Sequence, residues 1–280
     1  MAPRREVEAK IAALARTGDL ELIPLKSLQE QLPLVPKETT VAVTCSAKFG
    51  IGRTVDYAEL LAKAGHRVRA HLAARQVADR AALAELVERF EGAGVKELHV
   101  IGGDAEEPEG KYTSALELME DLSTMHHGFV LSVACYPEGH PKIPEDVLFE
   151  ALLAKQPYAS FMINQLCFDA RTLATWLASM RAAGITLPLR IGLAPPISPA
   201  KLLDLSLRIG VGTSVRYLSK QHGMLGSLLR GKFYRPEKLL GQLGEALVSP
   251  EMRIEGLHIF SFNQVEAALD WQRRVAAIQS

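Results

Sequence analysis

One pattern recurs along most of the chain: a short apolar stretch is followed by a longer amphipathic stretch, and the pair repeats eight times. The apolar stretches are rich in Val, Leu and Ile and end at glycine, proline or a polar loop, as buried strands do. The amphipathic stretches place apolar residues three and four positions apart, which is typical of helices packed on a core. Because a helix between two strands returns the chain to the same end of a sheet, the alternation predicts an α/β fold with parallel strands.

The repeat accounts for nearly all of the sequence. Strands are predicted at residues 20–24, 39–45, 67–72, 97–104, 128–136, 158–166, 189–194 and 257–262. A helix is predicted at residues 5–17, before the first strand, and further helices are predicted to start near residues 56, 79, 114, 145, 169 and 199. Residues 211–248 are predicted to be mostly helical, and Asn263 with Glu266 is predicted to cap a last helix that runs to about residue 279.

Eight strand–helix units after one extra helix indicate a single (βα)8 TIM barrel with a helical insertion before the eighth strand. The 280 residues fit this fold, since such barrels typically have about 250 residues. A doubly wound open sheet is the second alternative, but it would need fewer strands or a second domain. We therefore expect residues 1–280 to form one barrel domain.

Composition narrows the class of protein. The chain is 48% hydrophobic and 23% charged, as is ordinary for a soluble globular protein. Basic and acidic residues number 32 each, so no net charge favours binding to nucleic acid or to an anionic membrane. The first residues are charged rather than apolar, no apolar run approaches a membrane span, and the three cysteines lack metal-site spacing. These features predict a cytoplasmic protein with free thiols.

In a barrel of this kind the active site lies at the carboxyl ends of the strands. The polar residues expected there are Glu21, Thr44, His71, Asp104, Tyr136, Glu138, His140, Gln165 and Asn263. The set has few basic groups, so it suits a neutral heteroaromatic ligand and proton transfer better than phosphoryl transfer. Each residue could instead be a strand-end residue bonded to backbone. For Thr44 and His71 taken singly that alternative is the stronger one, whereas the two carboxylates Glu21 and Asp104 favour a function.

Other motifs are set aside. Gly50 and Gly52 lack the third glycine of a dinucleotide-binding fingerprint. Residues 226–232 resemble a phosphate-binding loop, but no strand precedes them and a phenylalanine follows in place of Ser or Thr. The strand histidines 71, 99 and 258 show no clear three-ligand set, so no metal site is expected.

A series of short segments resembles the methylenetetrahydrofolate reductase family. Residues 132–141, which end in Tyr-Pro-Glu-Gly-His-Pro, are similar to the family's Val-Ala-x-Tyr-Pro-Glu-x-His-Pro, and residues 165–169 resemble its Gln-x-x-Phe-Asp. Weaker similarities lie at residues 21–24, 43–44, 70–72, 103–104 and 262–263. These seven matches keep the family's order and span nearly the whole chain.

Two departures from the family concern its flavin. In flavin-bearing members an arginine precedes the Gly-Asp pair, and here Gly102 occupies that position. The helix after the His-Pro motif carries polar and basic groups that hold the cofactor phosphates in those members. Here residues 145–155 are largely apolar, with Lys155 as the one basic residue. The chain therefore resembles the flavin-independent branch known from actinobacteria, which implies that FAD is not bound.

The resemblance implies reduction of 5,10-methylenetetrahydrofolate to 5-methyltetrahydrofolate, a step of one-carbon metabolism and methionine biosynthesis. It implies NADH as direct hydride donor, with NADPH left open as an alternative. The implied roles are as follows: Glu21 is the general acid and Asp104 the second catalytic carboxylate; Gln165, Phe168 and Asn263 bind the substrate; Thr44, His71, Tyr136 and His140 line the cofactor site.

The partners expected are thus a folate and a nicotinamide, with no nucleic acid and no membrane; both a monomer and a homo-oligomer stay open. Two alternatives to direct hydride transfer are kept. One is the same reaction through bound FAD, and the other is a barrel that binds a folate or another pterin without turnover.

Overall fold

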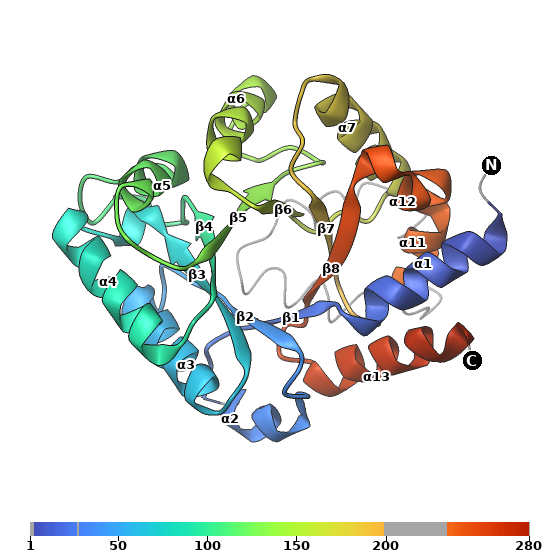
Figure 1. The fold of residues 1–280 in the computed structure, drawn as a ribbon, viewed down its shortest axis with the longest axis horizontal. Helices are drawn as coiled ribbons and strands as arrows, with labels where there is room; N and C mark the ends of the chain where they lie inside the picture. The colour runs from blue at the N-terminus through green and yellow to red at the C-terminus, as the bar shows by residue number, and fades with distance from the viewer. Residues whose placement is uncertain (1–2, 27, 199–233, 280) are drawn as a thin grey trace.

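The structure is a computed structural model that describes residues 3–26, 28–198 and 234–279. Eight parallel strands pair in chain order, and β8 pairs with β1, so the sheet closes into a barrel (Figure 1). The strands are β1 Asp19–Leu22, β2 Thr40–Val43, β3 Arg67–Ala73, β4 Glu97–Ile101, β5 Val130–Cys135, β6 Phe161–Asn164, β7 Leu189–Leu193 and β8 Ile254–Phe260. The (βα)8 prediction is confirmed.

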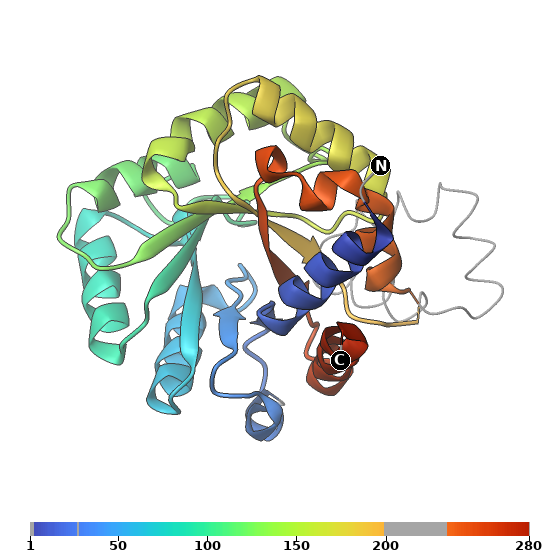
Figure 2. The same cartoon turned by 45° about the vertical axis from the view of Figure 1, so that its right-hand side comes forward.

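The helices surround the barrel (Figures 1 and 2). They are α1 Arg4–Arg16, α2 Leu28–Gln31, α3 Gly50–Lys63, α4 Arg80–Ala93, α5 Ala115–Ser123, α6 Glu145–Lys155, α7 Ala170–Ala182, α11 Pro236–Leu243, α12 Glu245–Val248 and α13 Val265–Ala276. Short 3-10 turns lie at Leu32–Leu34, Ala74–Gln76, Gln156–Tyr158, Pro250–Met252 and Ala277–Gln279. Within the described ranges no helix is long and apolar enough to cross a membrane.

The first and last helices close the chain on itself. Helix α1 buries Val7, Ile11 and Leu14 at helical spacing and packs against α13 (Figure 1). The Gln272 side chain of α13 donates to the carbonyls of Ala15 and Gly18, at the end of α1. These bonds satisfy carbonyls that a helix end leaves without an internal partner, so they hold α1 against the barrel where β1 begins.

Strand side chains alternate between the helix layer and the barrel interior. Leu20 and Leu22 of β1 are fully buried in the main apolar core, between the barrel and its helices. Asp19 and Glu21 point the other way, as the period of two in a strand requires. Their partners lie on β3, β7 and β8, and since β3 and β7 do not adjoin β1, those contacts cross the barrel interior.

Three local predictions need correction or qualification. Helix α3 begins at Gly50 rather than near residue 56, so the Gly50-to-Gly52 segment is its first turn. Asn263 does not cap α13: the N-cap is Gln264, and no side-chain cap bond is made there. The predicted helix start at residue 199 and the 211–233 part of the predicted helical insertion lie outside the described residues, whereas α11 and α12 confirm helix in the remainder.

Candidate active site

The barrel interior near the amino ends of the strands contains a cluster of charged side chains. The Arg69 guanidinium of β3 donates to Asp19 at 2.7 Å and to Glu97 at 2.9 Å, and Arg190 of β7 donates to Asp19 at 2.6 Å. The Phe161 ring lies against both guanidinium groups, 4.9 Å from Arg69 and 4.2 Å from Arg190. Burial opposes ionisation of Asp19, yet the two arginines outweigh it and hold its pKa below the usual value. Paired charges, rather than aliphatic side chains, thus fill this layer.

Glu21 lies two residues further toward the carboxyl end of β1. Its Oε2 atom is 3.1 Å from Nε2 of His258 on β8 and 3.6 Å from Nε2 of His71 on β3. The Glu21 side chain is 12% exposed, whereas the side chains of His71 and His258 are 9% and 1% exposed. Glu21 is therefore the most exposed member of a largely buried three-residue cluster, and its chain neighbours Leu20 and Leu22 are fully buried.

The histidine row continues across β4 and β5. The rings of His71 and His99 are 4.8 Å apart, and His99 Nδ1 lies 3.0 Å from the Ser132 hydroxyl, which donates to the Leu98 carbonyl. Burial lowers the pKa of His71 to about 4, with Glu21 opposing the shift, and burial also lowers the pKa of His99. Both rings are therefore neutral at pH 7 and offer hydrogen-bonding nitrogens without net charge.

Asp104, Tyr136 and His140 gather on the β4–β5 side of the barrel mouth. Tyr136 and His140 make an edge-to-face ring contact at 5.2 Å. Burial raises the pKa of Tyr136 to about 12, and the nearby charge of Asp104 acts in the same direction. Burial lowers the pKa of His140, against the opposing effect of Asp104. Asp104 itself is exposed in the loop after β4, so a negative charge lies beside two ring systems.

The loop after β6 carries Gln165 and Phe168. Gln165 folds back so that its Oε1 accepts from the backbone N–H of Leu166 at 2.7 Å. Phe168 makes an edge-to-face contact with Tyr234 at 5.2 Å, and its backbone N–H donates to Glu138 Oε1 at 3.3 Å. Burial raises the pKa of Glu138. Glu138 therefore links the β5 loop to the β6 loop and shapes the place where Phe168 lies.

Asn263 and Thr44 hold the ends of strands. The Asn263 side-chain amide accepts from the Ile23 N–H at 2.8 Å and donates to the Ile23 carbonyl at 2.9 Å. These two bonds join the chain after β8 to the chain after β1, just beyond the last backbone pair of the two strands. Asn263 adopts a left-handed backbone with φ of 56°, and such backbone strain in a residue other than glycine clusters at functional sites. Thr44 continues the β1–β2 pairing through its N–H to the Leu22 carbonyl. Substrate contact by Asn263 stays a prediction.

The contribution of His258 was not predicted. Glu21, His71 and His258 place one potential ligand atom each within 4.8 Å of one another, whereas the expectation of no metal site considered His71, His99 and His258 and stays a prediction. The signal was present in the alternation of β8, where His258 and Phe260 share the inward face, and in the closure of β8 on β1. Both become usable only once the barrel is known to close.

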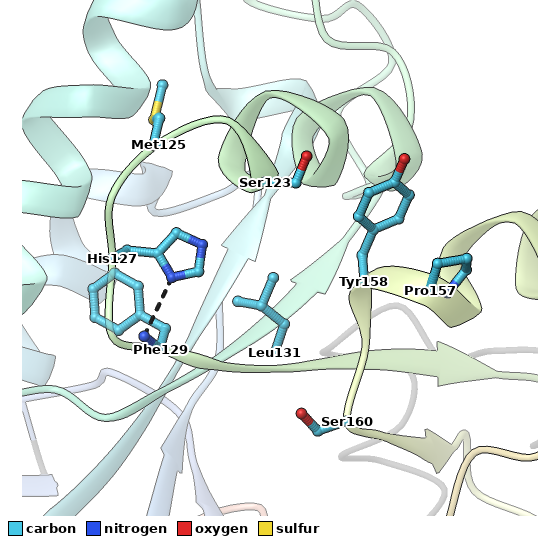
Figure 3. Close-up of a pocket in the computed structure, with 8 residues that line it drawn as sticks. All are labelled: Ser123, Met125, His127, Phe129, Leu131, Pro157, Tyr158 and Ser160. Carbon is cyan, nitrogen blue, oxygen red and sulfur yellow. Dashed lines mark hydrogen bonds between the residues drawn. The ribbon is translucent and has the colours of Figure 1, made fainter.

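A separate hollow lies at the opposite end of the strands. It has a volume of about 340 Å3 and lies between the end of α5, the start of β5 and the turn before β6 (Figure 3). Its lining includes His127, Phe129 and Tyr158. None of the predicted site residues lines it, so the candidate active site is the barrel mouth around Glu21.

A sequence profile described as methylenetetrahydrofolate reductase matches residues 31–209, more than half of the chain. The chain belongs to the methylenetetrahydrofolate reductase family. The matched segment contains His71, Asp104, Tyr136, His140, Gln165 and Phe168. Glu21 and His258 lie outside it, and the barrel brings them to the same mouth.

Two family members of known name are similar over part of their length. Methylenetetrahydrofolate reductase 2 of Saccharomyces cerevisiae is 31% identical over 100 residues, which are 34% of this chain and 17% of that protein. Methylenetetrahydrofolate reductase 1 of Schizosaccharomyces pombe is 31% identical over 97 residues, which are 33% of this chain and 16% of that protein. The alignments thus span less than a fifth of these curated relatives.

Solved structures support the fold. A GH18 chitinase from Cycas revoluta in complex with (GlcNAc)3 aligns with a TM-score of 0.54 and 11% identity, over 94% of this chain and 100% of that chain. A 2,3-dimethylmalate lyase aligns with a TM-score of 0.51 and 11% identity, over 97% of this chain and 83% of that chain. At such identities the likeness extends to the barrel and not to the chemistry.

Proposed function

We propose that this chain reduces 5,10-methylenetetrahydrofolate to 5-methyltetrahydrofolate, with a reduced nicotinamide as direct hydride donor and Glu21 as general acid. The observation that carries the proposal is the position of Glu21: a partly accessible carboxylate at the centre of the barrel mouth, hydrogen-bonded to His258. Family membership supplies the substrate class.

Glu21 would open the five-membered ring of the substrate. The proton of Glu21 passes to the departing nitrogen, and the carbon–nitrogen bond breaks. The electron pair of that bond stays on the nitrogen. A reduced nicotinamide supplies the hydride that converts the resulting iminium carbon to a methyl group. The overall reaction consumes one proton and one hydride, and His258 stabilises the Glu21 carboxylate that remains by donating from Nε2.

The surrounding groups suit the other tasks. Asp104 lies exposed beside Tyr136 and His140, where it could stabilise the positive charge that develops on the iminium. The oxygen of Gln165 accepts from the Leu166 N–H, and its amide nitrogen is a donor of the kind that a pterin edge can accept from. His71 is neutral and its side chain is 9% exposed, so it suits the uncharged carboxamide of a nicotinamide better than a charged group.

The absence of flavin from the cycle is supported by helix α6. Its first turn carries Glu145 and Asp146, and its last turn carries Lys155 as the only basic residue of the helix. Acidic side chains at a helix start oppose the binding of a pyrophosphate there. Val147 and Leu153 are 48% and 42% exposed and Glu150 is exposed as well, so the exposed surface of α6 offers apolar and acidic side chains rather than phosphate ligands.

We expect the purified protein to be colourless and to oxidise NADH only when methylenetetrahydrofolate is present. A visible spectrum checks for bound flavin, and a stopped assay at 340 nm checks turnover. Flavin recovered in near one-to-one amount would contradict direct transfer and favour the FAD alternative. Folate binding without NADH oxidation would instead favour a barrel that binds a pterin without turnover.

We expect Gln165→Ala and Asp104→Asn to separate binding from catalysis. Loss of a ground-state contact at Gln165 should mainly raise KM for the folate, because binding is lost about equally before and at the transition state. Loss of charge at Asp104 should lower kcat more than it weakens binding, because the charge it faces develops only during the reaction. Steady-state kinetics with varied folate measures both constants.

The melting temperature serves as control for this pair. Gln165 also shapes its loop through Leu166, so a variant that merely loosens the fold would lose stability and both kinetic constants together. A stable Asp104→Asn protein with unchanged kcat would remove Asp104 from the mechanism.

A further inference from the structure

The cluster of Glu21, His71 and His258 has the composition and spacing of a metal-binding site. Its ligand atoms are one carboxylate oxygen and two imidazole nitrogens, all within 4.8 Å of one another. Zn²⁺ with bonds of about 2.0–2.1 Å places neighbouring tetrahedral ligands roughly 3.4 Å apart. The Glu21-to-His258 and Glu21-to-His71 distances of 3.1 Å and 3.6 Å lie on either side of that value.

A second observation also points to a ligand. Nε2 of His71 is buried, points at the Glu21 carboxylate and has no hydrogen-bond partner among the described residues. A buried polar atom without a partner carries a free-energy cost of about 1–3 kcal/mol, which a bound ion would remove. Nδ1 of His258 is also buried without a hydrogen-bond partner among the described residues, whichever of its ring nitrogens carries the proton, and an ion bound at Nε2 would leave it so. If metal binding moves the His258 proton from Nε2 to Nδ1, an unpartnered Nδ1 acceptor becomes an unpartnered Nδ1–H donor. The proton shift therefore adds no further unpartnered atom.

The donor set selects the class of cation. Two nitrogens and one oxygen suit borderline ions such as Zn²⁺ or Co²⁺, whereas Mg²⁺ and Ca²⁺ prefer sites made of oxygen. The three donors come from β1, β3 and β8, so the closed barrel holds them in place before an ion arrives. The partial exposure of Glu21 leaves a route for the ion and a fourth coordination position for solvent.

We propose that Glu21, His71 and His258 bind one divalent cation of the Zn²⁺ class, and that the bound cation inhibits the enzyme. The inhibition rests on the proposed function: a Glu21 carboxylate that coordinates a metal cannot carry the proton that opens the substrate ring. The enzyme therefore cannot hold zinc at this site and protonate its substrate at the same time.

Binding is measured without any substrate, by calorimetric titration of the metal-free full chain with ZnCl2 and by visible absorption with CoCl2. We expect a stoichiometry near one, a Co²⁺ spectrum of four-coordinate intensity and a rise in melting temperature that a chelator reverses. His258→Ala and His71→Ala should each weaken Zn²⁺ binding by more than the roughly 10–100-fold that loss of an outer partner causes. His127→Ala, which removes a histidine from the hollow at the opposite end, is the matched control and should bind as the unaltered chain does.

The absence of saturable Zn²⁺ binding to the unaltered chain would overturn the proposal. A stoichiometric site that persists in both His258→Ala and His71→Ala would overturn it as well. Where an alanine variant fails to fold, His258→Gln and the Co²⁺ spectrum of the unaltered chain decide. Turnover assays then test the inhibition: Zn²⁺ should lower kcat in the concentration range in which calorimetry shows binding. A chain that binds Zn²⁺ but never oxidises NADH would contradict the reductase function and leave the metal site in place, whereas full turnover with the site filled would overturn the proposed inhibition.

Discussion

Glu21→Gln should lower kcat for methylenetetrahydrofolate reduction by about 10²–10⁴-fold, the usual cost of losing a general acid. Glutamine keeps the shape of the side chain, and its oxygen can still accept the hydrogen bond from Nε2 of His258. It cannot deliver a proton to the departing nitrogen. Folate binding should therefore change little, and the effect should appear in kcat, measured by NADH oxidation beside folate binding by calorimetry.

The control for this prediction is the same substitution elsewhere in the barrel. Glu255 lies on β8 with its side chain 56% exposed, so Glu255→Gln removes a strand carboxylate that faces solvent. We expect it to leave kcat unchanged. Glu21→Asp, which keeps an acid but withdraws it by one methylene, should retain more activity than Glu21→Gln. Near-normal turnover in Glu21→Gln would remove Glu21 from the mechanism.

Arg69→Met should lower the free energy of unfolding by about 3–5 kcal/mol, because it leaves buried carboxylates without their central partner. Arg69 has no exposed side-chain surface and binds both Asp19 and Glu97, whose side chains are 2% exposed. Methionine fills a similar volume, so the loss would come from uncompensated charge rather than from a cavity. Chemical denaturation, followed by circular dichroism, measures the change.

Arg67→Met is the matched control. Arg67 lies on the same strand and binds the same carboxylate, Glu97, but its side chain is 60% exposed. Exposed ion pairs typically contribute about 0–1 kcal/mol, so this variant should be far less destabilised. Equal losses of unfolding free energy in Arg67→Met and Arg69→Met would show that burial does not determine how much an arginine of this cluster contributes to stability.

The pH at which the chain unfolds in acid should depend on the same ionic cluster. The folded pKa of Asp19 lies below its unfolded value, so its contribution to stability is complete above the unfolded pKa and is lost as pH falls through the folded pKa. Removal of Arg69 removes part of the attraction that lowers this pKa. Arg69→Met should therefore unfold in acid at a higher pH than the unaltered chain, and an unchanged midpoint would argue against a charged Asp19.

Much of the fold is determined by short-range physics and could be predicted from the sequence. Helices were predicted to start near residues 114 and 169, and the Ser114–Glu117 capping box and the Asp169 N-cap, which act within one helical turn, begin α5 and α7 there. The alternation of apolar and amphipathic stretches determines which segments are strands and helices, and the number of strands then favours a closed barrel. Glu21 stands out because a carboxylate within an apolar strand requires a partner or a function.

Only the tertiary structure decided what surrounds that carboxylate. His258 is 237 positions from Glu21 and meets it because β8 pairs with β1, a contact that depends on how the ring of strands closes. Because of the same closure, Asn263, which was predicted to cap a helix, instead hydrogen-bonds both backbone groups of Ile23. Local propensity acts over a few residues, whereas strand register and barrel closure depend on the packing of all eight strands. The sequence by itself determined the barrel and the carboxylate at its mouth, and closure of the barrel decided that two histidines lie against that carboxylate.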